Sequence, residues 1–225
     1  MANGVNTEMN IGILGTGDVG KVLAAGFRAA GYDVMIGTRN PASGKLADWL
    51  AQVGKGVQVG TFSQAATFGE VIVLAIGWAH ARAAIELTNP ANFKGKVVLD
   101  TSNPLAFERE GQPPVLALGH TDSAGEQVQR WLPEARVVKW FNIVGNAHMV
   151  KPDFGGDKPD MFICGNDAAA KATASELAQQ LGWPPVIDLG DISKSRYLEP
   201  LAMVWITHLF NTGFNVNHAF RLLRK

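Results

Sequence analysis

The stretch Ile11-Gly-Ile-Leu-Gly-Thr-Gly-Asp-Val-Gly20 decides the fold. Its first four residues form an apolar run of strand length, and the glycines that follow have the spacing Gly-x-Gly-x-x-Gly. A stretch with helical spacing, residues 19–30, begins at once. The glycine spacing alone is a weak signal, but strand, glycines and helix in this order predict a βαβ unit that binds a dinucleotide. The candidate cofactor-binding residues of the loop are Gly15, Thr16, Gly17, Asp18, Val19 and Gly20.

Each glycine of this loop has a physical role. Gly15 permits the tight turn, Gly17 lets the backbone approach a pyrophosphate, and Gly20 lets the helix pack close to the strand. The first amides of the helix then face the anion. The alternative is a structural turn that holds no ligand.

The second strand ends in Thr38-Arg39-Asn40, about 20 residues beyond the glycines, where an NAD site places an acid for the ribose 2′-hydroxyl. Asp33 lies at the opposite end of that strand and cannot serve. The Thr38 hydroxyl and the Arg39 guanidinium can donate to a 2′-phosphate, which a carboxylate would repel. These residues therefore predict NADP(H) as cofactor, the alternative being that Arg39 is a solvated loop arginine.

Apolar runs of strand length alternate along the chain with stretches of helical spacing. This order predicts an α/β fold, a Rossmann-like doubly wound parallel sheet. We expect an NADP-binding domain in residues 1–150 and a small C-terminal strand and helix extension in residues 151–225, which closes the cleft of a single compact unit. The expected strands are 11–14, 33–36, 71–76, 96–100, 136–140, 160–164 and 186–189. The expected helices are 19–30, 45–53, 80–87, 125–132, 168–181 and a last one capped by Ser193 or Ser195.

Further candidates lie where later strands end, because ligands of open α/β sheets bind at the carboxyl edge. Small residues at the end of one strand let the backbone approach a ribose and a nicotinamide, and a histidine follows at the start of a helix. Trp78 and this histidine have packing and capping as alternative roles. Lys139 is interpreted as a strand-edge charge rather than a catalytic base. The candidate cofactor-binding residues here are Ala75, Ile76, Gly77, His80, Asn103 and Asn142, with loop shaping as the alternative for Asn103.

The composition excludes several classes of function. The 225 residues carry 20 Lys and Arg against 20 Asp and Glu, so no global basic field attracts nucleic acid or a membrane surface. The run LAMVWITHLF, residues 201–210, is too short to span a membrane and is predicted to be a buried helix. Because residues 198–210 are apolar nearly all round, they also predict a homodimer. The single cysteine, Cys164, and the absence of a signal pattern in MANGVNTEMN predict a cytoplasmic protein.

No catalytic residue and no metal site emerges from the sequence. His120, Asp122 and Ser123 lie too close in sequence to converge as a hydrolase triad, and no Gly-x-Ser-x-Gly elbow is present. The five histidines and the cysteine lack metal-ligand spacing.

Seven segments in order carry a resemblance to a known family: the glycine loop, IGTRNP, AIGWAH, DTSNPL, KWFN, CGND and LGDISKSRYLEPLA. Over nearly the whole chain the sequence resembles the NADPH-dependent reductases of coenzyme F420, a deazaflavin. It is also similar to the reductase domain of membrane ferric reductases. The resemblance implies that Thr16, Asp18 and Val19 lie in the phosphate loop and that Thr38 and Arg39 bind the 2′-phosphate. It also implies that Ala75, Ile76, Gly77 and His80 lie beside the nicotinamide half.

The resemblance further implies direct hydride transfer between NADP(H) and F420, a flavin or a related redox acceptor. Such a step requires alignment and exclusion of water more than an acid or base, which agrees with the missing catalytic dyad. Met149, Phe154 and the helix from Arg196 are expected to bound the acceptor pocket. The alternatives are a non-catalytic NADP(H)-sensing protein, and an NADP-dependent dehydrogenase of a small organic substrate.

Overall fold

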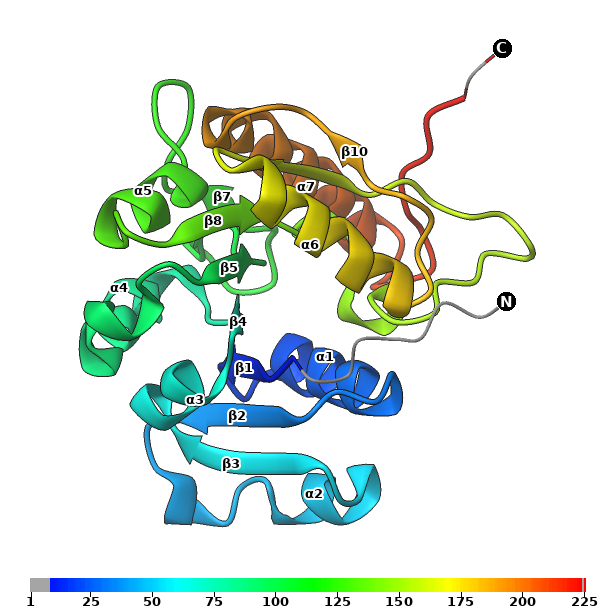
Figure 1. The fold of residues 1–225 in the computed structure, drawn as a ribbon. Helices are drawn as coiled ribbons and strands as arrows, with labels where there is room; N and C mark the ends of the chain where they lie inside the picture. Colours follow the sequence, from blue (N-terminus) through cyan, green and yellow to red (C-terminus); the bar gives the residue numbers. More distant parts are fainter. Residues whose placement is uncertain (1–8, 224) are drawn as a thin grey trace.

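The computed structural model describes residues 9–223 and 225. The expectation that no signal peptide is present concerned residues 1–10. Residues 1–8 of that segment lie outside the described residues. The main element is an eight-stranded sheet in the order β10-β9-β8-β5-β4-β1-β2-β3 (Figure 1). The strands are β1 (Ile11–Leu14), β2 (Val34–Thr38), β3 (Val57–Thr61), β4 (Val71–Leu74), β5 (Val97–Asp100), β8 (Arg136–Lys139), β9 (Phe162–Gly165) and β10 (Ile187–Asp188).

The strands from β3 to β8 run parallel, and their order reverses between β1 and β4. This arrangement confirms the predicted Rossmann-like sheet and places the switch point next to the glycine loop. One edge of the sheet departs from the parallel arrangement, because β9 pairs antiparallel with β8. The connection between them has only the short 3₁₀ helix η3 (Asn146–His148). Without a crossover helix, the chain returns from the carboxyl edge in the opposite direction.

Helices cover both faces of the sheet (Figure 1). On one face, Trp140 stacks on Phe27 of α1 and donates its indole N–H to the carbonyl of Ala174 in α6. On the other face lie α3, α4 and α5, and Trp78 of α4 stacks on Trp131 of α5. The helices are α1 (Asp18–Ala29), α2 (Ala47–Val53), α3 (Phe62–Phe68), α4 (Trp78–Thr88), α5 (Ala124–Trp131), α6 (Ala168–Gln180) and α7 (Ser195–Asn211).

Strand β3 and helix α3 were not predicted from the sequence. Only one residue of the edge strand β3, Gly60, is buried, so the strand lacks the continuous apolar run of the inner strands. Helix α3 follows without a loop, because Thr61 ends β3 and also caps the helix. The Thr61 hydroxyl accepts from the Gln64 amide at 3.2 Å, and the Gln64 side chain accepts from the Thr61 amide at 2.8 Å.

The predicted serine cap of the last helix was also wrong. Asp191 caps the 3₁₀ turn η4 (Ile192–Lys194) by accepting from the Ser193 amide, and α7 continues directly from that turn. Ser195 is the first residue of α7 and is buried, with its hydroxyl 3.3 Å from the Cys164 sulfur. Burial raises the pKa of the Cys164 thiol to about 11, so the thiol is protonated at neutral pH.

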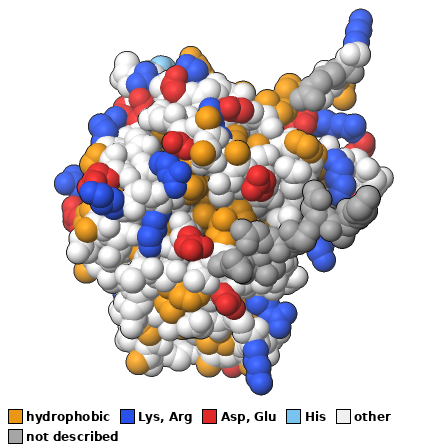
Figure 2. Space-filling model, viewed as in Figure 1, with side chains coloured by type: hydrophobic (Ala, Val, Ile, Leu, Met, Phe, Trp, Pro, Cys, Tyr) orange, Lys and Arg blue, Asp and Glu red, His pale blue; other side chains and the backbone are white. Residues whose placement is uncertain are grey.

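The surface carries both charge signs. Figure 2 shows basic and acidic side chains interspersed on the visible face. The strands β6 (Leu105–Ala106) and β7 (Val115–Leu116) pair antiparallel as a separate two-stranded sheet. Within the described residues, no helix combines the length and apolarity that crossing a bilayer requires.

Candidate functional site

A cleft of about 540 Å³ opens at the carboxyl edge of β1, β2 and β4. It occupies the switch point of the sheet, where ligands of this fold bind. Ten of the fifteen predicted site residues line it, and the other lining residues were not predicted. The lining residues are Gly15, Thr16, Gly17, Thr38, Arg39, Asn40, Ser43, Lys45, Phe62, Ala75, Ile76, Gly77, His80, Ala83, Ala84 and Leu87.

The glycine loop forms one wall of the cleft. Gly15 has a φ of +121°, and a Cβ atom there would clash with the carbonyl oxygen of Ala75. A Cβ on Gly20 would clash with the carbonyl oxygen of Gly15, so Gly20 is buried beneath the loop and does not line the cleft. A Cβ on Gly17 would meet nothing within 4 Å. The open space at Gly17 is therefore on the ligand side.

The start of α1 faces this space without a protein cap. Gly17 is the N-cap residue and no side chain bonds to the first turn. Unpaired helix amides attract an anion through hydrogen bonding and the helix dipole. Asp18 and Val19 begin the helix, but their side chains do not line the cleft.

The two glycines allow a direct test. Gly17→Ala should leave the melting temperature unchanged within about 1 °C and weaken NADPH binding about tenfold, because the added methyl occupies the ligand side of the loop. Gly20→Ala should lower the melting temperature by roughly 3–8 °C, because its methyl overpacks the turn. Thermal unfolding and calorimetric titration of both variants measure the contrast. Equal loss of stability in the two would refute the open space at Gly17.

Two cations lie at the end of β2. Arg39 and Lys45 are both exposed and both line the cleft, and no acid among the described residues forms a salt bridge with either. Lys45 and Ser43 were missed because they follow the strand by a turn. Pro41 begins the 3₁₀ turn η1 (Pro41–Ser43), and Gly44, with a φ of +70°, turns the chain so that Lys45 reaches the cleft. Two positive charges beside hydroxyl groups fit a dianionic phosphate.

The end of β4 forms the opposite wall. Gly77 is the N-cap of α4, and a Cβ there would meet nothing within 4 Å. His80 is in the first turn of α4, lines the cleft, and its backbone amide donates to the carbonyl of Gly77 at 2.9 Å. Trp78 points to Trp131 instead, with ring centroids 5.3 Å apart. Of its two interpretations, packing is the one that its contacts support.

Asn103 and Asn142 do not line the cleft but bind each other. The Asn103 amide donates to the Asn142 carbonyl at 2.8 Å, and the Asn142 amide donates to the Asn103 side-chain oxygen at 2.9 Å. Asn103 is half-buried, whereas Asn142 is 5% exposed.

Lys139 is not the strand-edge charge that was predicted. It is fully buried at the end of β8, where its ammonium group contacts Asp100 at 2.6 Å, Glu199 at 2.9 Å and the carbonyl of Ser102 at 2.9 Å. Burial alone lowers the pKa of Lys139, but attraction to the two carboxylates outweighs it and raises the pKa above its usual value. The sequence missed this cluster because its members lie up to 99 positions apart, between Asp100 and Glu199.

Other candidates of the sequence do not form a site. Ser123 caps α5, and Asp122 binds Arg130 at 2.8 Å, so neither takes part in a relay with His120. Among the described residues, no three His, Cys, Asp or Glu side chains gather closely enough to hold a metal.

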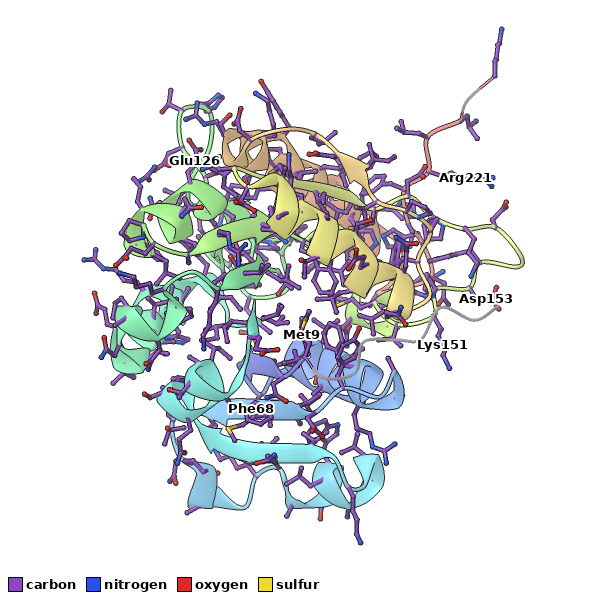
Figure 3. The ribbon with its side chains drawn as sticks, in the orientation of Figure 1. Met9, Phe68, Glu126, Lys151, Asp153 and Arg221 are labelled. Atoms are coloured by element: carbon purple, nitrogen blue, oxygen red, sulfur yellow. The ribbon has the colours of Figure 1, made fainter. Side chains whose placement is uncertain are left out.

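The residues expected to bound an acceptor pocket are otherwise engaged. Met149 is buried, with its carbonyl accepting from the Trp183 indole at 2.9 Å, and Phe154 packs on His148. Arg196 of α7 binds Glu126 at 2.8 Å; Figure 3 shows Glu126 on α5. None of the three lines the cleft.

Comparisons with known proteins agree with this geometry. Residues 10–104 match the model of the family described as NADP oxidoreductase coenzyme F420-dependent. The chain is 32% identical over 223 residues to the F420-dependent NADP reductase of Methanocaldococcus jannaschii, covering 93% of this chain and 94% of that protein. A solved structure from Arthrobacter sp. FB24, a candidate F420-dependent NADP reductase, superposes with a TM-score of 0.90 at 39% identity, covering 96% of this chain and 100% of that one.

A second group of relatives is longer. The chain is 32% identical over 195 residues to Metalloreductase STEAP3 of Rattus norvegicus, covering 86% of this chain but only 36% of that protein. The resemblance seen in the sequence is thereby confirmed: the chain belongs to the family of F420-dependent NADP oxidoreductases.

Proposed function

We propose that the protein transfers a hydride between NADP(H) and coenzyme F420. The observation that carries the proposal is a single cleft that joins an uncapped glycine loop to two cations at the end of β2. An acid at the end of β2 would favour NAD, whereas Arg39 and Lys45 favour a 2′-phosphate. The names of the Methanocaldococcus relative and the Arthrobacter structure support F420 as the second substrate.

The residues present fit the cofactor along the whole cleft. The first amides of α1, reached over Gly17, would hold the pyrophosphate. Thr38, Arg39, Asn40 and the newly found Ser43 and Lys45 would hold the 2′-phosphate and its ribose. The nicotinamide, when bound, supplies the hydride. Ala75, Ile76, Gly77 and His80 would lie along the path from the pyrophosphate to the nicotinamide.

The task of this chain is then alignment rather than proton transfer. No dyad of acid and base faces the cleft among its lining residues, where His80 is the one titratable side chain besides the two cations. A hydride passes directly between two flat rings, so rate depends on holding them close and dry.

A reductase assay tests the proposal. Purified protein is mixed with NADPH and, in turn, F420, FMN, FAD and a ferric chelate, and the loss of NADPH absorbance is followed. We expect the highest kcat/KM with F420. Tight NADPH binding without turnover of any acceptor would favour the sensing protein instead. Turnover only with a small imine or hydroxy acid would favour the dehydrogenase.

Three further points belong to the proposal. Exposed side chains of α7, among them Tyr197 and Val204, support a homodimer, which sedimentation at two protein concentrations would test. The single, buried Cys164 supports a reducing, cytoplasmic location. The division into a cofactor-binding unit of residues 1–150 and an extension of residues 151–225 stays a prediction.

A further inference from the structure

The reciprocal bonds between Asn103 and Asn142 fix the orientation of both side chains. The Asn142 amide nitrogen faces two acceptors, the Asn103 side-chain oxygen at 2.9 Å and the Leu198 carbonyl of α7 at 3.1 Å. Reversing that amide would place oxygen against oxygen twice, so the assignment of its nitrogen follows from the contacts. Both amide protons of Asn142 are therefore used within the protein.

The two asparagines differ in what they leave unused. Asn142 keeps only its side-chain oxygen, which is buried and has no partner among the described residues. Asn103 is half-buried and donates one of its two amide protons to the Asn142 carbonyl. It retains one N–H donor and one lone pair on its oxygen. A donor next to an acceptor on one amide is the complement of a primary carboxamide.

Asn103 follows the end of β5, next to β4, and lies beyond the residues that line the cleft. The Thr101 amide and hydroxyl both donate to the Leu74 carbonyl, at 3.2 Å and 3.1 Å, which ties the end of β5 to the end of β4. Asn103 follows two residues later. The two cations at the end of β2 would bind the adenosine half of the dinucleotide, on the other side of the switch point. The nicotinamide half would then extend towards β4 and β5.

We propose that Asn103 recognises the carboxamide of the nicotinamide, and that Asn142 is the positioning residue that holds Asn103 for this contact. The inference rests on the proposed binding of NADP(H). Asn142 also donates to the Leu198 carbonyl of α7. The position of α7 and the orientation of Asn103 are therefore linked through Asn142. When its carboxamide is held, the nicotinamide ring cannot turn about the glycosidic bond, so one face of the ring is presented to the acceptor.

Calorimetric binding of three ligands tests the role of Asn103. They are NADP⁺, its 3-acetylpyridine analogue, which keeps the carbonyl and loses the N–H donors, and 2′,5′-ADP, which lacks the nicotinamide half. Wild-type protein should bind NADP⁺ about tenfold tighter than the analogue, because the analogue lacks one hydrogen bond and one such bond changes the affinity by about that factor. In Asn103→Leu this ratio should fall to about one, while the affinity for 2′,5′-ADP stays unchanged. Asn103→Ala serves if the leucine variant fails to fold.

A second variant tests the positioning role of Asn142. Asn142→Asp keeps the size of the side chain but sets an oxygen against both Leu198 and Asn103. The variant should bind NADP⁺ and the analogue equally well and should have a lower kcat for hydride transfer. Its affinity for 2′,5′-ADP should stay unchanged. Asn211→Asp, an exposed asparagine at the end of α7, is the matched control and should keep all three affinities.

The outcomes separate this inference from the proposed function. If 2′,5′-ADP and NADP⁺ both fail to bind wild-type protein, the NADP(H) function falls and the carboxamide contact with it. If both bind and Asn103→Leu keeps the tenfold ratio, the contact is refuted while the function stands. If Asn142→Asp weakens 2′,5′-ADP as much as NADP⁺, its role is structural and the positioning role is refuted.

Discussion

Replacing Arg39 with aspartate is expected to weaken NADPH binding about a hundredfold and to leave NADH binding within about threefold. The variant removes a charge-assisted hydrogen bond, worth about 1.5–3 kcal/mol, and sets a carboxylate against the 2′-phosphate. NADH lacks that phosphate, so it loses neither term. Fluorescence titration of the two cofactors with wild-type and variant protein measures the difference. Lys45→Ala should show the same selectivity with a smaller loss, because the lining of the cleft places both cations at one end.

The control for this prediction is Arg109→Asp. Arg109 is an exposed arginine in the turn between β6 and β7, outside the cleft, so the same change of charge there should leave both affinities unaltered. Equal weakening of NADPH and NADH by Arg39→Asp would mean that Arg39 shapes the loop and does not select the cofactor.

Replacing Lys139 with methionine is expected to lower the free energy of unfolding by about 3–5 kcal/mol, or the melting temperature by roughly 10 °C. The variant leaves Asp100 and Glu199 buried without their cation, and each contacts the lysine at 2.9 Å or less. An uncompensated buried carboxylate takes up a proton more readily in the folded than in the unfolded chain, so the deficit should shrink as the pH falls. Denaturant unfolding at two pH values checks both statements.

Lys94→Met is the matched control for Lys139. Lys94 forms a contact of the same kind with Glu134, at 2.6 Å, but the two side chains are 70% and 61% exposed. Solvent screens that pair, so its loss should leave the free energy of unfolding nearly unchanged. If Lys139→Met were as mild as Lys94→Met, the buried cluster would not hold α7 on the sheet.

Local pattern predicted strand β1 and the start of α1. Strand β1 and the loop up to Gly20 depend on neighbouring residues only, so glycine spacing and apolar length suffice to place them. Arg39 was found because its distance from the glycines is set by one helix and one strand. Lys45 was missed because its place depends on a left-handed turn at Gly44, which the strand pattern does not contain.

Pairings between distant segments were beyond the sequence. The direction of β9 depends on how the connection after β8 runs across the molecule, and no local period encodes that path. Lys139 was misjudged for the same reason, since its partners come from β5 and α7. Asn103 and Asn142 follow the ends of β5 and β8, as their sequence predicts, but their mutual hydrogen bonds could not be predicted from the sequence.

The carboxylate of Glu199 affects which helix start is free to bind an anion. Its two oxygens accept from the Ala124 and Gly125 amides at the start of α5, each at 3.0 Å. A carboxylate of the same chain thus binds the first amides of α5, whereas no side chain caps α1. A free phosphate or sulfate ion therefore finds the start of α5 occupied by Glu199 and the start of α1 open. Inhibition by such salts should therefore be competitive with the dinucleotide.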